Sequence, residues 1–400
     1  MGTKRAITPI VNSIAQTCKD GPFLDLFCGI GSVGKALADI RPLWCNDVQQ
    51  FAVIMAKCNF TDPEGLLSTD FLEAFTENFM VNQKALLERW SGWVNCEREA
   101  TDGVSVELLS DINKKIPNVF TSTELAESRA ANCIRKTAPY DLFTSCYAGT
   151  YLGISQCIEI DSAIFAIDAL KATGALSFFQ QHWLLLAVCN SASKCSTTTG
   201  HFAQFLTANE NNVKYFVNKR KKSIYKEIIN CIPHCVPCGS NNWRQNNKVY
   251  NFDAISLLEH LKNENKTPGV IYADPPYTEE QYSRYYHLYE TLILYDYPEV
   301  FAKARYRAMR YRSPFSVKTE VNMSMNHLIE KSSEIGSDFM LSYPAKGLLG
   351  NSIEAISGLL RKYYSKIEII NQFTHSHSSF GASNTRSRNE ATELIFLATH

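Results

Sequence analysis

The residues best suited to chemistry are four consecutive ones, Asp274, Pro275, Pro276 and Tyr277. The carboxylate of Asp274 and the carbonyl of Pro275 both accept hydrogen bonds, so together they suit an NH2 group, which has two donors. An exocyclic amine held in this way directs its lone pair toward an electrophile, and the flat ring of Tyr277 can stack on a heterocycle. The motif therefore predicts group transfer to an amine. The alternative is a proline-stiffened turn without a chemical role.

The apolar run at residues 269–273 must position this motif. It predicts a short buried strand of a parallel sheet. Pro275 and Pro276 cannot continue the strand, because a proline has no N–H to donate to the ladder. The chain therefore leaves the sheet at the carboxyl end of the strand, which is the edge where open α/β sheets bind their ligands.

A glycine-rich turn near the N-terminus is the second candidate site. Residues 23–27 predict a buried strand, and Gly29, Gly31 and Gly34 follow at the spacing G-x-G-x-x-G before a helix. This strand–turn–helix lets the backbone approach a nucleotide-like ligand closely. Asp47 ends the next predicted strand, where a carboxylate would bind the two ribose hydroxyls. A dinucleotide-dependent dehydrogenase would share these features but would leave Asp-Pro-Pro-Tyr without a role.

Asp25 inside the first strand and Phe27 just before the glycines distinguish the motif further. The sequence Asp-Leu-Phe-Cys-Gly-Ile-Gly-Ser, followed much later by Asp-Pro-Pro-Tyr, resembles S-adenosylmethionine-dependent amino-methyltransferases. More narrowly, it resembles the DNA adenine-N6 methyltransferases of the Dam-like, D12 class. In that class a lysine-bearing motif comes first, as Lys4 does here, and a long target-recognition insert separates the glycine motif from Asp-Pro-Pro-Tyr.

The resemblance implies an α/β fold with a Rossmann-like methyltransferase sheet and a long, mainly helical target-recognition insert. Residues 1–60 and 245–400 would form one discontinuous methyltransferase domain, and residues 61–244 would form the insert. The implied cofactor is S-adenosylmethionine. The residues expected to bind it are Lys4, Asp25, Phe27, Gly29, Gly31, Asp47, Asp253 and Asp274. The role implied for Asp253 is to lie near the cofactor's adenine, and the same residue can also cap the helix that follows it.

The implied activity is site-specific methyl transfer to N6 of adenine in DNA, the reaction of EC 2.1.1.72, within a restriction-modification system. Asp274, Pro275, Pro276 and Tyr277 would be the catalytic residues, acting on a base rotated out of the duplex. Two alternatives stay open. One is an N-methyltransferase acting on RNA or another amine, and the other is a non-catalytic DNA-binding subunit of a modification or defence system. The intact motifs favour the enzyme.

Apolar periodicity predicts helices through much of the insert, and residues 367–370 and 393–398 predict a final antiparallel hairpin. Basic residues in two places are candidates for phosphate contacts, and the tyrosine-rich stretch around Arg284 is a candidate for lining the pocket of a flipped base. The predicted DNA-binding residues are Lys219, Arg220, Lys221, Lys222, Arg284, Arg386 and Arg388. The alternatives are a solvated helix face for the first run, a packed aromatic helix around Arg284, and a flexible surface loop for the last two.

Composition limits the class of protein. The 400 residues are 45% hydrophobic and 20% charged, with a formal net charge of zero, so a basic surface for DNA must be local. We expect no signal peptide and no membrane span, and therefore a cytoplasmic protein whose 13 cysteines are reduced. Expected partners are DNA and a cognate restriction endonuclease or defence-system subunits. Cys231, His234, Cys235 and Cys238 lie too close together for an easy tetrahedral zinc site, so we predict no metal.

Overall fold

The structure is a computed structural model that describes residues 7–66, 69–378 and 388–400, and it describes no side chains within residues 371–391. The chain divides into two compact units, here called the sheet unit and the helical unit. The sheet unit comprises Met1–Pro63, Pro237–Ser283 and Tyr311–His400. The helical unit comprises Glu64–Val236 and Arg284–Arg310.

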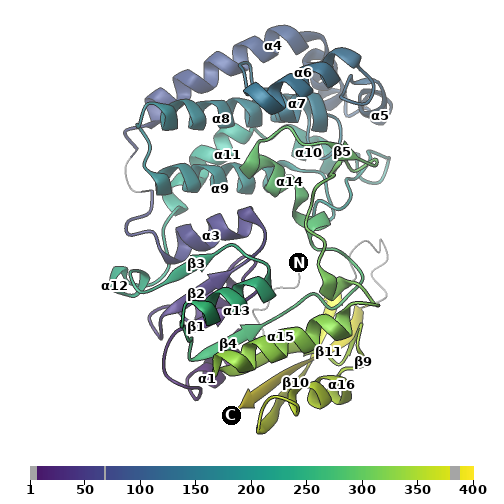
Figure 1. The fold of residues 1–400 in the computed structure, drawn as a ribbon. Helices are drawn as coiled ribbons and strands as arrows, with labels where there is room; N and C mark the ends of the chain where they lie inside the picture. The colour runs from purple at the N-terminus through teal and green to yellow at the C-terminus, as the bar shows by residue number, and fades with distance from the viewer. Residues whose placement is uncertain (1–6, 67–68, 379–387) are drawn as a thin grey trace. The chain divides into compact units, whose positions relative to one another are not determined.

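The sheet unit contains a seven-stranded sheet in the order β10-β11-β7-β4-β1-β2-β3 (Figure 1). Its strands are β1 (Phe23–Asp25), β2 (Leu43–Asn46), β3 (Lys248–Tyr250), β4 (Val270–Ala273), β7 (Asp338–Pro344), β10 (Lys366–Ser378) and β11 (Arg388–Thr399). Neighbours from β3 to β7 pair in parallel, whereas β11 runs antiparallel to both β7 and β10. The structure confirms the predicted mostly parallel α/β sheet and its final antiparallel hairpin.

The strand order reverses next to β1. From β1 the chain builds β2 and β3 on one side, and it later adds β4 and β7 on the other. Register between β1 and β4 is fixed by pairs such as Asp25 with Tyr272, and Leu26 donates its N–H to the carbonyl of Tyr272 over 2.9 Å. The carboxyl ends of β1 and β4 are therefore neighbours at a topological switch point, which is where open α/β sheets bind ligands.

Helices cover both faces of this sheet. Along β4, Ile271 and Ala273 enter one buried cluster, while Val270 and Tyr272 enter another, as the two-residue period of a strand requires. The first cluster includes residues of α13 (Ala254–Asn263), α15 (Val321–Ile335) and α16 (Ser352–Leu360). The second includes residues of α1 (Thr8–Ala15), α2 (Ser32–Ala36) and α3 (Gln50–Phe60). The short α12 (Asn241–Arg244) and the ribbon β8 (Lys346–Gly347) with β9 (Gly350–Asn351) complete the unit.

The helical unit confirms the predicted helical character of the insert. Its helices are α4 (Leu72–Asp102), α5 (Val106–Lys115), α6 (Thr123–Arg135), α7 (Leu142–Tyr147), α8 (Ile154–Ala172), α9 (Phe178–Cys195), α10 (Val213–Arg220), α11 (Ile224–Cys231) and α14 (Ser283–Leu294). Two short strands, β5 (Val300–Phe301) and β6 (Tyr306–Arg307), pair after α14. Helix α8 is apolar around most of its circumference because α4, α7, α9 and α11 pack against it (Figure 1).

Residues 284–310 belong to the helical unit, although the prediction placed them in the methyltransferase domain. The reason is the packing of α14. His287 is buried, its Nε2 lies 3.0 Å from the carbonyl oxygen of Phe202, and its ring lies 5.7 Å from that of Tyr151. Burial lowers the pKa of His287 to about 3. The aromatic face of α14 therefore packs inside the helical unit, and His287 is a neutral core residue.

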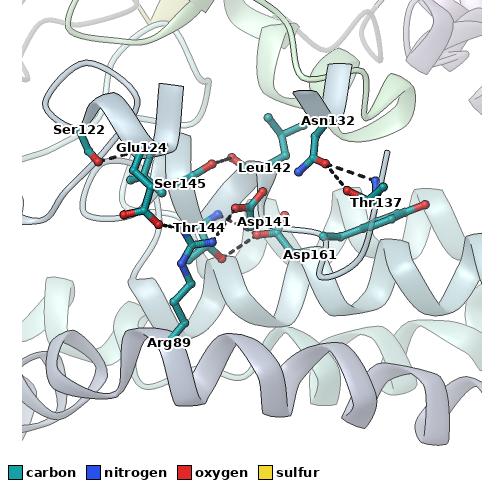
Figure 2. A network of polar contacts seen from close by, with 12 residues as sticks. Arg89, Ser122, Glu124, Asn132, Thr137, Asp141, Leu142, Thr144, Ser145 and Asp161 are labelled. Atoms are coloured by element: carbon teal, nitrogen blue, oxygen red, sulfur yellow. Dashed lines mark hydrogen bonds and ion pairs between the residues drawn. The ribbon is translucent and has the colours of Figure 1, made fainter. Parts of the chain in front are cut away.

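A buried carboxylate organises the start of α7 (Figure 2). Asp161, on α8, accepts hydrogen bonds at 2.8 Å from the backbone N–H groups of Phe143 and Thr144, which have no partner within the helix. The hydroxyls of Thr144 and Tyr295 donate to the same carboxylate, each over 2.6 Å. Burial nevertheless raises the pKa of Asp161 to about 7. The network fixes α7 against α8 through polar contacts in the core.

In the described parts of the chain, no helix is both long enough and apolar enough to cross a membrane.

Candidate active site

The glycine-rich turn after β1 forms as predicted, and two observations explain its glycines. Gly29 and Gly31 have φ values of +50° and +74°, a region that side chains with a Cβ rarely adopt. A Cβ on Gly31 would lie 2.9 Å from the ring of Phe60, and one on Gly34 would lie 2.7 Å from the same ring. A Cβ on Gly29 would meet nothing within 4 Å, so the turn presents its backbone to open space. A ligand can approach the main chain there.

Asp47 follows β2 directly and is tied to this turn. Its Oδ2 accepts the N–H of Gly29 over 3.0 Å, and its Oδ1 accepts the N–H of Gln49 over 2.9 Å. The amide of Asn251, just beyond β3, donates to the carbonyl of Asp47 over 2.8 Å. The half-buried carboxylate is thus held at the carboxyl edge of the sheet, beside the turn, as the ribose-binding prediction requires.

Asp253 follows β3 and takes the cap position of α13, where its Oδ1 accepts the N–H of Ser256 over 3.1 Å. The capping role is therefore confirmed. Asp253 and Asp47 share a neighbour that the sequence did not reveal, the phenol of Tyr311. Burial raises the pKa of Tyr311 to about 12, and the negative charges of Asp253 and Asp47 contribute to this shift. No motif surrounds Tyr311, so only the structure could identify it.

The Asp-Pro-Pro-Tyr motif leaves the sheet at the end of β4, as predicted. Pro275 is buried, and Asp274 and Tyr277 are half-buried. The ring of Tyr277 packs edge-on against Tyr343, with 6.3 Å between the centroids, and its carbonyl accepts the N–H of Leu348 over 3.2 Å. The orientation of the Tyr277 ring is therefore supported on one side by Tyr343.

The predicted cofactor residues that the structure describes gather at one edge of the sheet. Asp25 is buried within β1, and Phe27 packs its ring edge-on against Phe315 at 5.6 Å. The glycine turn, Asp47, Asp253 and Asp274 follow the carboxyl ends of β1, β2, β3 and β4. Lys4 lies outside the described residues. An exposed turn backbone with carboxylates for hydroxyl groups fits an adenosine-bearing cofactor that carries a positive charge.

The basic run at the end of α10 does not form one phosphate-binding surface, and the prediction is corrected for Arg220. This side chain is buried, donates from Nη2 to the carbonyl of Thr150 over 3.0 Å and stacks on Phe216 at 4.8 Å. Because it sits on the inner face of α10, it stabilises the helical unit instead of meeting solvent.

The three lysines of the run differ from Arg220. Lys219 donates to the carbonyl of Lys194 over 2.7 Å, and Lys221 pairs with Asp102 at 3.0 Å. Lys221 and Lys222 are exposed. Contact with DNA stays a prediction for these lysines.

The three other predicted DNA contacts differ in how far the structure describes them. Arg284 stacks on Tyr306 at 5.2 Å and donates from Nη2 to its hydroxyl over 3.3 Å. Arg386 lies outside the described residues, and Arg388 begins β11 with its side chain outside the description. All three stay predictions.

The cysteine-rich segment after α11 is shared between the two units. Cys231 and Cys235 belong to the helical unit, where the Sγ of Cys235 donates to the carbonyl of Cys231 over 3.4 Å. Cys238 belongs to the sheet unit, and its Sγ donates to Oδ1 of Asn59 over 3.6 Å. Within the described ranges, no three His, Cys, Asp or Glu side chains gather closely enough to hold a metal ion.

Comparison with known proteins agrees with this geometry. Residues 166–340 match the model of the D12 class N6 adenine-specific DNA methyltransferases, a stretch that includes Asp253 and the Asp-Pro-Pro-Tyr motif. The chain is 35% identical over 353 residues to the type II methyltransferase M.FokI of Planomicrobium okeanokoites, which covers 88% of this chain and 44% of the relative.

Two further relatives are more distant. The modification methylase LlaI of Lactococcus lactis subsp. lactis is 22% identical over 394 residues, covering 97% of this chain and 52% of the relative. The type II methyltransferase M.NlaIII of Neisseria lactamica is 21% identical over 398 residues, covering 98% and 94%. The chain thus spans about half the length of the first two relatives and nearly all of the third. These matches agree with the resemblance drawn from the motifs: residues 166–340 are similar to the D12 class N6 adenine-specific DNA methyltransferases, and most of the chain is similar to DNA methyltransferases.

Proposed function

We propose that this protein is a site-specific DNA methyltransferase that transfers the methyl group of S-adenosylmethionine to N6 of adenine, the reaction of EC 2.1.1.72. One observation carries the proposal. The glycine turn and Asp-Pro-Pro-Tyr leave the neighbouring strands β1 and β4 at the switch point of the sheet. A cofactor motif and an amine-binding motif at adjacent strand ends suit transfer between two bound molecules. The family match supports adenine as the acceptor.

The residues of the glycine turn would hold the cofactor. The backbone at Gly29 and Gly31 would follow its adenosine and methionine parts, Asp47 would accept hydrogen bonds from the ribose hydroxyls, and Asp253 would lie at the adenine. When bound, S-adenosylmethionine supplies a methyl group on a positively charged sulfur. The carboxylates along this edge favour such a charge.

Asp-Pro-Pro-Tyr would hold the acceptor base. The Asp274 carboxylate and the Pro275 carbonyl accept hydrogen bonds from the two N–H groups of N6, which directs the nitrogen lone pair toward the methyl group. Tyr277, supported by Tyr343, would stack on the adenine ring. Asp274 and Pro275 would hold N6 in line for the methyl group that the bound cofactor would supply, and the proton that N6 loses on transfer would pass to solvent. Positioning and lone-pair orientation would supply most of the catalysis.

The helical unit would recognise the target sequence. Its exposed Lys221 and Lys222 and the half-buried Lys219 and Arg284 are candidate phosphate contacts, because a chain with no net charge must concentrate its basic residues locally. The relatives are named type II methyltransferases and a modification methylase, which supports a cognate restriction endonuclease as a partner in the same system.

Methylation of DNA by the purified protein tests this function. The full chain is incubated with mixed plasmid DNA and S-adenosylmethionine labelled in the methyl group, and the nucleosides are then separated. Label in N6-methyladenine supports the proposal, and mapping the methylated sites gives the recognition sequence. Label in RNA, or in another base, would replace adenine in DNA with that substrate. Cofactor binding without transfer to any nucleic acid would indicate a non-catalytic subunit.

A further inference from the structure

One segment at the site has no role in the mechanism above. The chain re-enters the sheet unit at Tyr311, and residues 311–316, here called the return segment, end in the short helix η3 (Pro314–Ser316). Its contacts join the loop after β4 to the loop after β1, the two loops that form the candidate active site.

The first anchor of the return segment is on the Asp-Pro-Pro-Tyr side. The side-chain amide of Gln281, just beyond that motif, makes two hydrogen bonds to the backbone of Ser313. Its Oε1 accepts the N–H of Ser313 over 2.7 Å, and its Nε2 donates to the carbonyl of Ser313 over 3.0 Å. The hydroxyl of Ser316 adds a bond to the carbonyl of Glu280 over 3.3 Å. Two bonds from one planar amide fix both the position and the direction of the chain at Ser313.

The second anchor is on the glycine-turn side. Phe315 is 2% exposed and packs in the same core cluster as β1 and α13. Its ring meets the edge of Phe27 at 5.6 Å, and Phe27 immediately precedes the glycine turn in the chain. The return segment is therefore held on the Asp-Pro-Pro-Tyr side through Ser313 and Ser316 and on the glycine-turn side through Phe315, and all three residues are buried.

Tyr311 begins this anchored segment and lies near the predicted cofactor acids. Its side chain is partly open to solvent, at 37% exposure, yet the charges of both Asp253 and Asp47 act on its phenol. Burial, together with these two carboxylates, raises the pKa of Tyr311 to about 12. Like any tyrosine hydroxyl, that of Tyr311 is protonated at neutral pH, so it can donate a hydrogen bond to a ligand near the two acids. An aromatic ring with a donor next to a ribose-binding carboxylate suits a nucleoside.

We propose that Tyr311 contacts the cofactor: its ring covers the adenosine half of S-adenosylmethionine, and its hydroxyl donates a hydrogen bond between Asp47 and Asp253. This role rests on the proposed function. Gln281 is a positioning residue in this arrangement, because it fixes the backbone at Ser313, two residues after Tyr311. The return segment would thereby complete the cofactor site of the sheet unit.

Binding measurements on the full chain test this role without relying on activity. Titration calorimetry with S-adenosylmethionine and with S-adenosylhomocysteine gives the dissociation constants for wild type, Tyr311→Phe, Tyr311→Ala and Gln281→Ala. The control is Tyr363→Phe, which changes another half-buried tyrosine of the sheet unit, one hydrogen-bonded to Asn326 at 3.1 Å. Thermal unfolding of each variant verifies that it folds.

We expect Tyr311→Ala to weaken both ligands to the same degree, by about tenfold or more, because they share the adenosine half. Tyr311→Phe should weaken them by about threefold, which isolates the hydroxyl and is the deciding variant if the alanine change lowers the melting temperature. Gln281→Ala should weaken both ligands and speed amide exchange at Ser313. In steady-state assays of the Tyr311 variants, the KM for the cofactor should rise while kcat stays within about twofold. The reason is that Tyr311 would stabilise the bound cofactor equally in the ground state and in the transition state.

Unchanged dissociation constants in Tyr311→Ala would overturn the role of Tyr311, and so would equal losses in Tyr363→Phe. The proposed function fails separately. Wild type that binds both ligands but methylates no nucleic acid would remove the enzymatic function while leaving the Tyr311 comparison valid. Wild type that binds neither ligand would overturn both proposals.

Discussion

The backbone N–H of Gly29 donates a hydrogen bond to Oδ2 of Asp47 over 3.0 Å, which joins the glycine turn after β1 to the acid after β2. Gly29 has a positive φ of +50°, which glycine adopts readily, so the turn can place this N–H toward Asp47 without backbone strain. The backbone proposed to bind the cofactor and the acid proposed to bind its ribose are therefore already joined in one element of the structure.

Replacing Asp47 should weaken cofactor binding strongly. Asp47→Asn keeps the shape but removes the charge, and one of its two polar atoms becomes a donor facing the N–H of Gly29 or Gln49. We expect the dissociation constant for S-adenosylmethionine to rise by about 10- to 100-fold, the worth of a charge-assisted hydrogen bond. Calorimetry measures it. Asp39→Asn is the matched control, since Asp39 bonds to Ser240 instead; an equal loss there would contradict the assignment.

Asp274 should matter for transfer and much less for cofactor binding. Asp274→Ala removes one of the two acceptors proposed for N6 and should abolish methyl transfer, a loss of at least about 100-fold in kcat. Asp274→Asn retains an acceptor oxygen and should keep more activity than the alanine variant. The assay is incorporation of labelled methyl groups into DNA, with calorimetry of the cofactor alongside. Methylation retained by Asp274→Ala would contradict the proposed mechanism.

Substitutions in the glycine turn should lower the free energy of unfolding for two separable reasons, overpacking and backbone strain. Gly34→Ala would place a Cβ 2.7 Å from Phe60 and 2.8 Å from Leu43, and overpacking of this kind costs about 1–3 kcal/mol of unfolding free energy. Phe60→Leu should relieve part of that cost in the double variant, because the two residues contact each other. Urea unfolding of both single variants and the double variant gives the coupling energy.

Gly31→Ala is the comparison for that cycle. Its Cβ would meet Phe60 at 2.9 Å, but its φ of +74° adds a backbone penalty of about 1–2 kcal/mol that no change at Phe60 removes. In the Phe60→Leu background, the remaining loss of stability should therefore be larger for Gly31→Ala than for Gly34→Ala. A remaining loss that is no larger at Gly31 would show that the positive φ carries no cost here.

The buried Asp161 should make folding stability depend on pH. Its folded pKa of about 7 lies above the ordinary value of 3.8, so between these values the folded chain binds more protons than the unfolded chain. Its contribution to stability is present below about pH 4 and decreases as pH rises toward 7, by on the order of 4 kcal/mol. Urea unfolding at several pH values measures the slope. Asp161→Asn should be less stable and should flatten this slope, so identical slopes would contradict the assignment.

The divided basic run predicts two different phenotypes. Lys222→Ala should lower the slope of log affinity against log salt concentration by about one if this exposed lysine contacts a phosphate. Arg220→Ala should leave that slope unchanged and destabilise the chain, because the buried guanidinium bonds to the carbonyl of Thr150. Filter binding to a random duplex at several salt concentrations, together with thermal unfolding, distinguishes these outcomes.

The parts of the site that the sequence revealed are those built by local rules. A strand followed by glycines, or by two prolines, dictates where the chain turns, so the edge carrying Gly29 and Asp274 could be placed without a structure. Burial within the helical unit could not be placed in this way. Periodicity shows that α14 has an aromatic face, but the partners of that face, such as Tyr151 and Phe202, lie far away in the chain.

The same limit explains the two largest surprises at single residues. Arg220 is one of four consecutive basic residues, and the sequence of that run does not show which of the four side chains is buried. Tyr311 became a candidate only because Asp47 and Asp253 act on it electrostatically. Both acids lie far before it in the sequence, and tertiary folding brings them near. Spacing along the chain identifies the side chains that follow the ends of strands. Identifying side chains that come together from distant segments requires the three-dimensional structure.

The division of the helical unit into Glu64–Val236 and Arg284–Arg310 has a consequence for exchanging this unit, the proposed recognition unit, between relatives. A chimera made with one continuous replacement of the first segment would put α14 of one protein into the core of another. His287 would then face foreign neighbours in place of Tyr151 and the carbonyl of Phe202. Functional chimeras need two simultaneous replacements, and a natural recombination event that moved only one would yield a poorly packed protein.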